Sequence, residues 1–356
     1  MSAASTLPAI YCPIPRTVHP QTASVDAHSV EWMRSRPCFA GRVSARLERA
    51  DVGGLASAFF PHGKQEALEA ISDFFCWGFA FDDLIESLAT SDLAEAADRQ
   101  FGLLRVLDAP ESALPTADPF TEAFIDIARR FARLAAPAVW RRWIGHTRSF
   151  AIGVIWACVY RAADRVPRFD EFAVLRPLDA GAPNNGAVLV ELAEGFAVPD
   201  DQLEHPYLRT VTDILGTILS WDNDICSYLV ESEGSLERIN LVTVLARHHG
   251  ISARAAVAEA IHLRNRAMWC YLRHRNNDPF VGRPGHDIVR GYVNSLDNLI
   301  SGNLHWSMAH TSRYHTAAPL LDLTLHTCPA DDLGDRDLTR PIESPGLRWW
   351  WAELSR

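Results

Sequence analysis

The chain has 356 residues, of which 48% are hydrophobic and 22% charged, and its formal net charge is −10. This composition provides for a sizeable core and excludes wholesale disorder. The excess of acidic residues argues against a general binder of nucleic acid or anionic membranes, because both partners require clustered basic surface. An anionic substrate stays open, since bound metal ions reverse the local sign of the charge.

Cysteine usage and the apolar runs bear on the compartment. The seven cysteines are widely spaced and form no Cys-x-x-Cys pair, which indicates buried free thiols in a reducing compartment. Residues 1–16 lack a basic segment followed by an apolar one, so we see no secretory signal. No apolar run of about 18 residues occurs, so no membrane-spanning helix is expected. We therefore expect a cytoplasmic protein.

In chain order, the proline-rich residues 1–24 predict an extended N-terminal arm. Helical periodicity then dominates, with short Pro- and Gly-containing breaks. The predicted helical stretches are 25–50, 64–88, 118–164, 205–232, 236–276 and 285–312. No series of alternating strands is present, which disfavours a sheet-based fold. Residues 316–356 predict a partly ordered tail, or a tail that packs its tryptophans (349–351) on the helical body or on a partner.

A first acidic cluster, Asp82, Asp83 and Glu86, follows a strongly apolar stretch at 68–81. Asp82 and Glu86 are four residues apart and share one face of a helix, where like charges repel unless a cation lies between them. Hard cations prefer carboxylate oxygens, and Mg²⁺ commonly uses one or two carboxylates together with substrate phosphate. A solvated helix end explains this cluster equally well when it is taken alone.

A second cluster, Asn223, Ser227 and Glu231, follows the apolar pattern of residues 211–221. A helix turns by about 100° per residue, so side chains spaced by four line one stripe with a drift of roughly 40° per step. Amide, hydroxyl and carboxylate oxygens suit a hard divalent cation. A polar outer stripe is the alternative. Two oxygen-rich clusters at the polar ends of apolar helices favour a metal site.

Basic residues that could bind a phosphate lie outside these clusters. Arg313 and Tyr314 end the last helical stretch and offer a guanidinium fork and a hydroxyl donor. Arg176 precedes a break in which Pro177 is expected to disfavour helix at Arg176 and Gly181 lets the backbone turn. Such a break exposes backbone carbonyls inside a cavity. Taken alone, each arginine is explained as a surface cation.

Four motifs occur in a fixed order along the chain. They are Phe81-Asp82-Asp83-x-x-Glu86, Arg176-x-x-Asp179-x-Gly181, Asn223-Asp224-x-x-Ser227-x-x-x-Glu231 and Arg313-Tyr314. In this order they resemble the microbial class I terpene synthases, over roughly residues 10–315. The resemblance implies an all-α fold, a single-domain class I terpenoid synthase α-helical bundle around a deep apolar pocket. The domain would span 25–315, between the arm and the tail at 316–356.

The resemblance also implies a metal site at the mouth of that pocket. Its ligands would be Asp82, Asp83 and Glu86 on one lip, and Asn223, Ser227 and Glu231 on the other. Three Mg²⁺ ions, for which Mn²⁺ can substitute, would clamp the diphosphate of an isoprenyl diphosphate substrate. Asp224 belongs to the motif without a ligand role. Val230 is a departure, because members of the family often carry Lys or Arg just before the final glutamate.

Further roles are implied for residues around the leaving group. Arg176 would sense the diphosphate, Asp179 would link the response, and the carbonyl of Ala180 would act on the substrate. Arg313 and Tyr314 would close over the diphosphate.

Three aromatic residues are candidate cavity walls. Phe59 lies just before the first pocket helix, Phe79 about one turn before the acidic cluster, and Trp306 about two turns before Arg313. An aromatic face stabilises a cation by roughly 0.5–2 kcal/mol. Ordinary core packing is the alternative for each of them.

The implied activity is ionisation and cyclisation of a linear isoprenyl diphosphate, with farnesyl diphosphate as the first choice and geranylgeranyl diphosphate, giving a diterpene, as the alternative. An isoprenyl chain-elongating transferase is a second alternative, but it would usually need two aspartate-rich motifs, and this chain has one. A non-enzymatic helical scaffold suits the acidic charge and the tryptophan-rich tail, but not inward-facing metal ligands. The sequence permits a homodimer as well as a monomer.

Overall fold

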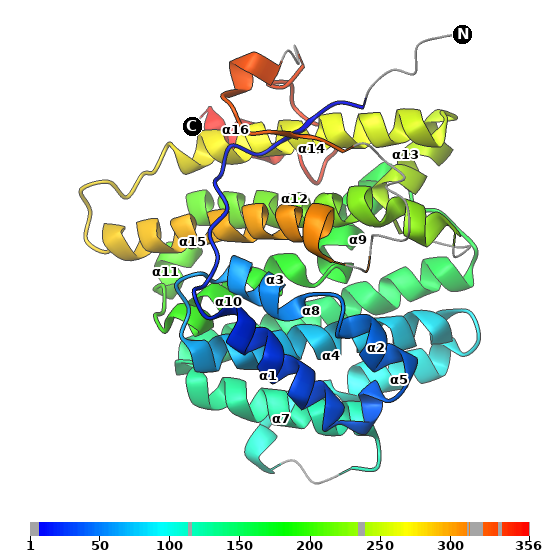
Figure 1. The fold of residues 1–356 in the computed structure, drawn as a ribbon. Coiled ribbons are helices and arrows are strands. Elements are labelled where there is room, and N and C mark those ends of the chain that lie inside the picture. Colours follow the sequence, from blue (N-terminus) through cyan, green and yellow to red (C-terminus); the bar gives the residue numbers. More distant parts are fainter. Residues whose placement is uncertain are drawn as a thin grey trace.

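The computed structural model describes residues 7–112, 116–233, 239–311, 313, 323–333 and 337–355, except for side chains at 42–44, 182–185, 229–233, 310, 331 and 332. The all-helical fold that the sequence predicts is confirmed (Figure 1). None of the described helices is long and apolar enough to cross a membrane.

The first half of the chain contributes the helices α1 (Thr22–Arg34), α2 (Arg42–Leu47), α3 (Val52–Phe59), α4 (Gln65–Ala89), α5 (Leu93–Gly102), α6 (Leu104–Asp108), α7 (Pro119–Leu134) and α8 (Pro137–Ala162). The second half contributes α9 (Phe169–Asp179), α10 (Ala182–Glu194), α11 (Asp200–Leu203), α12 (Pro206–Glu233), α13 (Leu241–His249), α14 (Ala253–Arg275), α15 (His286–His305) and α16 (Trp349–Leu354).

Three of the predicted helical stretches are divided in the structure. The stretch 118–164 forms two helices, and the second begins at Pro137. A proline has no N–H to donate and fits the first position of a helix, so it starts a new helix here and does not continue the old one. The stretch 25–50 is divided by a short 3₁₀ turn that also begins with a proline, Pro37. The third division, in the stretch 236–276, falls at Gly250, which ends α13 with a φ of 63°. Two of the three divisions therefore follow proline chemistry that the apolar pattern alone does not register.

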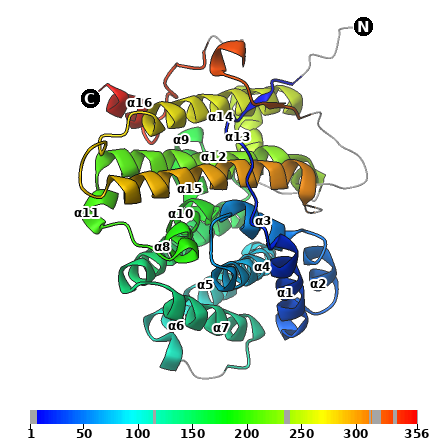
Figure 2. The same cartoon turned by 60° about the vertical axis from the view of Figure 1, so that its left-hand side comes forward.

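The helices pack in layers around α4 and α12 (Figures 1 and 2). Helix α12 packs against α14, α10 and α15, and helix α4 packs against α1, α3 and α7. Helix α8 packs against α9 and α10 and closes the remaining side. The two long helices that carry the predicted acidic and Asn/Ser motifs are thus held from several directions, which fixes the positions of their polar ends.

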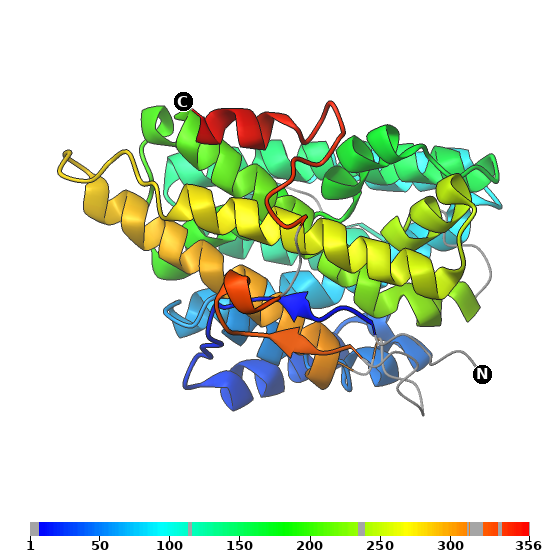
Figure 3. The same ribbon diagram turned by 90° about the horizontal axis from the view of Figure 1, so that it is seen from above.

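The chain segments before α1 and after α15 meet on the outer layer. Strand β1 (Ile10–Tyr11) pairs in parallel with strand β2 (Leu325–His326), and the two lie side by side next to α14 (Figure 3). Asn265 of α14 fixes β1, because its Oδ1 accepts from the N–H of Tyr11 at 2.8 Å and its Nδ2 donates to the carbonyl of Ala9 at 2.9 Å. These two hydrogen bonds attach β1 to α14.

A buried ion pair lies under this segment. The Arg264 guanidinium is fully buried and donates to both carboxylate oxygens of Asp222 on α12, at 2.7 and 3.1 Å, and to the carbonyl of Tyr11.

The C-terminal tail contacts the same helix, α12. Trp350 of α16 is fully buried and donates from Nε1 to Asp213 at 2.7 Å. The tail therefore packs Trp350 on the helical body.

Helix α1 is attached to α4 through a titratable contact. His28 Nε2 lies 3.0 Å from Oδ2 of the fully buried Asp73, which also accepts from Arg130 at 2.7 Å. The hydrogen bond to Asp73 raises the pKa of His28. The folded state thus favours protonated His28, so its stabilising contribution is full below the ordinary histidine pKa of about 6.5 and is lost as the pH rises through the raised value.

We expect His28→Gln to lower the free energy of unfolding more at about pH 5.5 than at about pH 9. The difference should stay below about 1 kcal/mol, because the imidazole is partly exposed and screened by solvent. Urea unfolding of the variant and the parent at both pH values measures it. An equal loss at both values would show that His28 contributes packing only.

Candidate active site

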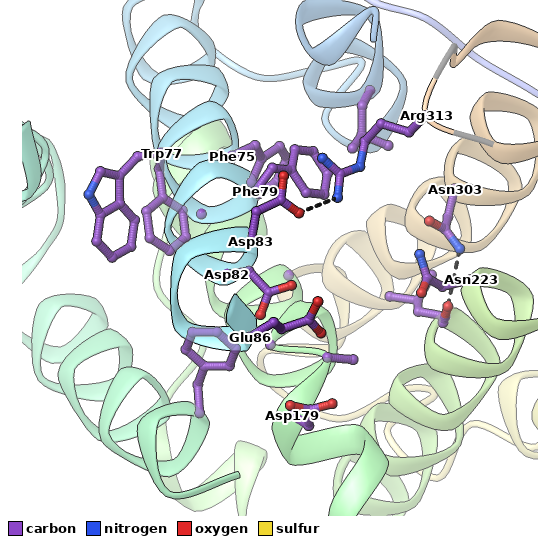
Figure 4. Close-up of a pocket in the computed structure, with 18 of the residues that line it drawn as sticks. Phe75, Trp77, Phe79, Asp82, Asp83, Glu86, Asp179, Asn223, Asn303 and Arg313 are labelled. Carbon is purple, nitrogen blue, oxygen red and sulfur yellow. Dashed lines mark hydrogen bonds and ion pairs between the residues drawn. The ribbon is translucent and has the colours of Figure 1, made fainter. Parts of the chain in front are cut away.

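A cavity of about 280 Å³ lies between the walls formed by α4 and α12. Aromatic and aliphatic side chains form its apolar part, and acidic and basic side chains gather at its polar end (Figure 4). The predicted site residues that line it are Phe59, Phe79, Asp82, Asp83, Glu86, Arg176, Asp179, Ala180, Asn223, Trp306 and Arg313. The structure therefore brings together side chains from α3, α4, α9, α12 and the segment after α15.

The acidic wall comes from one face of α4. Asp82, Asp83 and Glu86 all line the cavity. Burial raises the pKa of Asp82 well above its usual range, and the neighbouring carboxylates of Glu86 and Asp179 raise it further. Arg161 acts in the opposite direction on the same carboxyl group. Carboxylates crowded at a partly desolvated site repel one another, so this wall is electrostatically suited to bind a cation.

Two of the three carboxylates that α4 contributes to the cavity are already engaged in ion pairs. Asp83 lies 3.2 Å from Nη1 of Arg46 on α2 and 3.4 Å from Nη2 of Arg313. Glu86 lies 2.6 Å from Nη2 of Arg161 on α8. Asp83 thus connects the N-terminal part of the chain to the segment after α15, at the edge of the cavity.

The opposite wall comes from α12. Asn223 lines the cavity (Figure 4). Ser227 is fully buried, and its Oγ has no hydrogen-bond partner among the residues that the structure describes. A buried hydroxyl without a partner is costly, and a bound cation or its water would satisfy it. Glu231 lies in the last turns of α12, but its side chain is outside the described residues.

Arg176 links the break after α9 to α12. Its guanidinium donates to Asp179 at 2.9 Å, to Asn223 at 2.9 Å and to Asp224 at 2.9 Å. Asp224 also accepts from the N–H of Leu241, at the start of α13, at 2.9 Å. Asp224, to which no ligand role was assigned, is therefore a structural acceptor that orients Arg176 and attaches α13 to α12.

The prediction that Pro177 would keep Arg176 out of a helix is wrong. Helix α9 runs through both residues and ends at Asp179. The steric preference of a residue before proline is modest, and the buried hydrogen bonds of the Arg176 guanidinium outweigh it. The break falls instead at Gly181, which has a φ of 64°. A side chain at Gly181 would be strained by that φ, and its Cβ would lie 2.9 Å from the ring of Phe150.

The C-terminal end of α9, just before the break, packs closely against α8. A Cβ at Gly153 of α8 would lie 2.5 Å from the backbone carbon of Leu178 and 2.6 Å from the N of Asp179. Only glycine permits this approach. It places Ala180, the residue at the break, on the cavity wall.

The three predicted aromatic residues pack around the cavity. Phe79 stacks on Trp306 with ring centroids 5.9 Å apart and an interplanar angle of 7°. The indole N–H of Trp306 donates to the carbonyls of Ala50 and Asp51, each at 2.9 Å. Phe59 packs edge to face on Phe75, with centroids 5.8 Å apart.

Trp306 begins a π-helical turn, Trp306–His310, and Arg313 follows it. The Arg313 guanidinium lies 4.5 Å from the ring centroid of Phe79, a cation–π contact. Phe79 therefore fixes Arg313 at the edge of the cavity as well as lining the wall. Tyr314, the other member of the predicted pair, lies outside the described residues.

Several cavity residues were not identified from the sequence. Arg46 and Arg161 add guanidinium groups at the polar end, and Phe75, Gly78, Phe150 and Asn303 line the walls. Phe75 lies four residues before Phe79 on α4, so helical spacing could have identified it. No comparable signal exists for Arg46 and Arg161, because their positions depend on how α2 and α8 pack against α4.

The polar end of the cavity offers oxygen donors that suit a metal ion. Within the described part of the chain, no three His, Cys, Asp or Glu side chains converge into a pre-formed metal site. The carboxylates of α4, the amide of Asn223 and the partnerless hydroxyl of Ser227 are nevertheless oxygen donors of the kind that hard divalent cations prefer. They fit a site that uses few protein ligands and is completed by the oxygens of a bound phosphate.

Comparison with known proteins agrees with this geometry. Residues 73–268 match the family described as terpene synthase family 2, C-terminal metal binding. Bonnadiene synthase of Allokutzneria albata is 30% identical over 363 residues, which cover 97% of each chain. The (2E,6E)-farnesyl diphosphate cyclizing 4-epi-cubebol synthase of Streptosporangium roseum is 29% identical and covers 87% of this chain and 93% of its own.

A solved structure extends the similarity to the whole fold. The SVS_A2 protein from ancestral sequence reconstruction is 28% identical, with a TM-score of 0.81 over 98% of this chain and 100% of its own. The match over more than half of the chain and the 30% identical relative carry the assignment. The chain belongs to the terpene synthase family and is a class I terpene synthase, a metal-dependent lyase that ionises and cyclises a linear isoprenyl diphosphate.

Proposed function

We propose that the protein converts farnesyl diphosphate into a cyclic sesquiterpene with release of diphosphate. The observation that carries the proposal is a single apolar cavity with an acidic wall on α4, an Asn/Ser wall on α12 and arginines between them. A relative named as cyclising farnesyl diphosphate supports the same substrate.

We further propose that Asp82, with Asp83 and Glu86, holds Mg²⁺ from one side, and that Asn223, Ser227 and Glu231 hold it from the other. Three Mg²⁺ ions are proposed, with Mn²⁺ as a substitute. When bound, Mg²⁺ neutralises charge on the diphosphate and so favours its departure. The partnerless Oγ of Ser227 and the raised pKa of Asp82 support this ligand set.

Side chains of the protein are proposed to bind the diphosphate directly. Arg176 and Arg313, which both line the cavity, would donate to the oxygens of the departing diphosphate and so stabilise its charge electrostatically. Tyr314 is proposed to add a hydroxyl donor. Asp179 holds Arg176 through the bond at 2.9 Å and links it to the backbone turn at Ala180, whose carbonyl would face the substrate.

The apolar end of the cavity has a different task. Phe59, Phe79 and Trp306 are buried or half-buried and exclude water, which would otherwise capture the carbocation. Aromatic faces also stabilise a nearby cation by roughly 0.5–2 kcal/mol each. Because Phe79 already contacts the Arg313 guanidinium at 4.5 Å, we assign it a second task, the placement of Arg313.

A product assay tests the proposal. The purified protein is incubated separately with geranyl, farnesyl and geranylgeranyl diphosphates, with and without Mg²⁺, and hexane extracts are analysed by gas chromatography–mass spectrometry. We expect a Mg²⁺-dependent cyclic hydrocarbon or alcohol from farnesyl diphosphate. A cyclic product from geranylgeranyl diphosphate alone would make it a diterpene synthase, and chain-lengthened diphosphates formed with isopentenyl diphosphate would make it a transferase.

A further inference from the structure

Asn303 of α15 places an uncharged amide in the wall of the active-site cavity. The acidic and basic side chains of the described cavity wall gather at its polar end, and the amide of Asn223 belongs to the proposed metal-binding wall. Asn303 has no part in the proposed metal site or in the proposed binding of diphosphate. Its contact Leu219 and its neighbour Trp306, three residues on along α15, form apolar parts of the same wall. The function of this amide is therefore open.

Two contacts fix the orientation of the Asn303 amide. The preceding residue, Gly302, lies so close to α3 that a Cβ there would be 3.0 Å from the backbone of Ala58, which sets the face that α15 turns to the cavity. The Nδ2 of Asn303 donates to the carbonyl of Leu219 on α12 at 3.3 Å. A carbonyl only accepts hydrogen bonds, so the amide cannot be reversed with Oδ1 toward Leu219. The Oδ1 is thus turned into the cavity (Figure 4).

The Oδ1 of Asn303 is a hydrogen-bond acceptor that receives no donor from the protein. Within the part of the chain that the structure describes, the side chain of Asn303 forms no hydrogen bond besides the one to Leu219. Asn303 is 8% exposed, so a substrate that fills the cavity would separate this oxygen from bulk water. An acceptor left without a donor in such a place is costly. A single retained water molecule would remove that cost.

A buried water needs at least two polar partners, and Asn223 offers the second. Asn223 lies one turn after Leu219 on α12, and Figure 4 shows its amide beside that of Asn303. The Oδ1 of Asn223 accepts from Arg176 at 2.9 Å, which turns its Nδ2 away from Arg176. A water at Asn303 would donate to Oδ1 of Asn303 and accept from Nδ2 of Asn223. This position lies between the metal-binding wall and the apolar wall.

We propose that Asn303 holds one water molecule in the cavity and that this water ends the reaction by capturing the carbocation, so that the main product is a cyclic alcohol. The inference rests on the proposed function, since the captured cation comes from the ionised isoprenyl diphosphate. The water donates one O–H to Oδ1, and a lone pair on its oxygen forms the new C–O bond. The resulting oxonium group loses a proton to an oxygen of the released diphosphate. Asn303 thus orients the water and does not take its proton.

The test compares Asn303→Leu and Asn303→Ala with the parent and with the control Asn298→Leu. Asn298 also lies on α15 and is also 8% exposed, but it does not line the cavity. Each protein is incubated with Mg²⁺ and each of the three isoprenyl diphosphates in ¹⁸O-labelled water, and the products are analysed by gas chromatography–mass spectrometry. We expect the parent to form a cyclic alcohol that carries ¹⁸O. Asn303→Leu should lower the ratio of alcohol to hydrocarbon by about 10-fold, the order of effect of one lost buried hydrogen bond. Asn298→Leu should leave this ratio unchanged.

The outcomes separate the inference from the proposed function. A parent that forms only cyclic hydrocarbons, or an alcohol without ¹⁸O, would overturn the inference and leave cyclisation intact. An unchanged ratio in folded Asn303→Leu and Asn303→Ala variants would also overturn it, because the water would then be held elsewhere. Loss of all products from both variants, with thermal unfolding as in the parent, would show that Asn303 positions α12 through Leu219 and holds no reacting water. A parent that forms no cyclic product from farnesyl diphosphate would instead overturn the proposed function.

Discussion

Replacing Asp82 with alanine is expected to lower kcat/KM for farnesyl diphosphate by about 10²–10³-fold, the usual loss when one group that stabilises developing charge is removed. Asp82 lines the cavity, and burial and the adjacent carboxylates raise its pKa. Among the three cavity carboxylates of α4, it is therefore the one whose ionised form a bound cation would stabilise most. Asp83 and Glu86 are already paired with arginines. Product formation at several Mg²⁺ concentrations measures the effect.

The conservative variant Asp82→Asn tests the metal role separately. It keeps the shape of the side chain and removes its charge, so we expect the Mg²⁺ concentration for half-maximal rate to rise by roughly 10–100-fold. Glu66→Ala is the matched control, because Glu66 lies on the same helix and its side chain is exposed. Turnover of Asp82→Ala equal to that of the parent at ordinary Mg²⁺ would remove Asp82 from the proposed ligand set.

Replacing Arg264 with methionine is expected to lower the free energy of unfolding by about 3–5 kcal/mol, because it leaves the carboxylate of Asp222 buried without its partner. Both side chains are fully buried, and Arg264 also donates to the carbonyl of Tyr11. Urea unfolding measures the loss. Arg34→Met is the control, since Arg34 forms an exposed ion pair with Glu48, and such pairs contribute about 0–1 kcal/mol.

The double variant Arg264→Met/Asp222→Leu makes this prediction sharper. Replacing both members of a buried ion pair with apolar residues is often close to neutral, so the double variant should be more stable than Arg264→Met alone. If the double variant were less stable than the single one, the loss would come from apolar packing around Arg264, and the account of an unpaired charge would be wrong.

The helical fold could be predicted from the sequence because amphipathic patterns repeat with a helical period over long stretches. The structure brings the acidic cluster, Arg176, Asn223 and Arg313 to one cavity, although their roles as ligands and donors stay predictions. The side chain of Glu231 and all of Tyr314 lie outside the described residues, so their roles also stay predictions. The homodimer that the sequence permits also stays a prediction.

What could not be predicted depends on contacts between elements. Arg161 reaches Glu86 only because α8 packs beside α4, and no spacing within the sequence records that contact. The predicted conformation at Arg176 was wrong for a related reason. Pro177 sets a local preference, but the helical conformation is stabilised by acceptors of the Arg176 guanidinium on α12, which lie more than 40 residues away along the chain.

The parallel pairing of β1 with β2 has a consequence for the order in which the chain folds during synthesis. Residues 10–11 leave the ribosome early, but their partners at 264–265 and 325–326 are made much later. At about 5–20 residues per second, the interval before β2 is complete is roughly 15–60 s. During this time Ile10, Tyr11 and Cys12, which are all buried in the folded chain, have no docking surface on α14. This apolar segment is thus covered only after α14 and β2 have been made, so a chaperone that binds short apolar segments has time to bind it in the nascent chain.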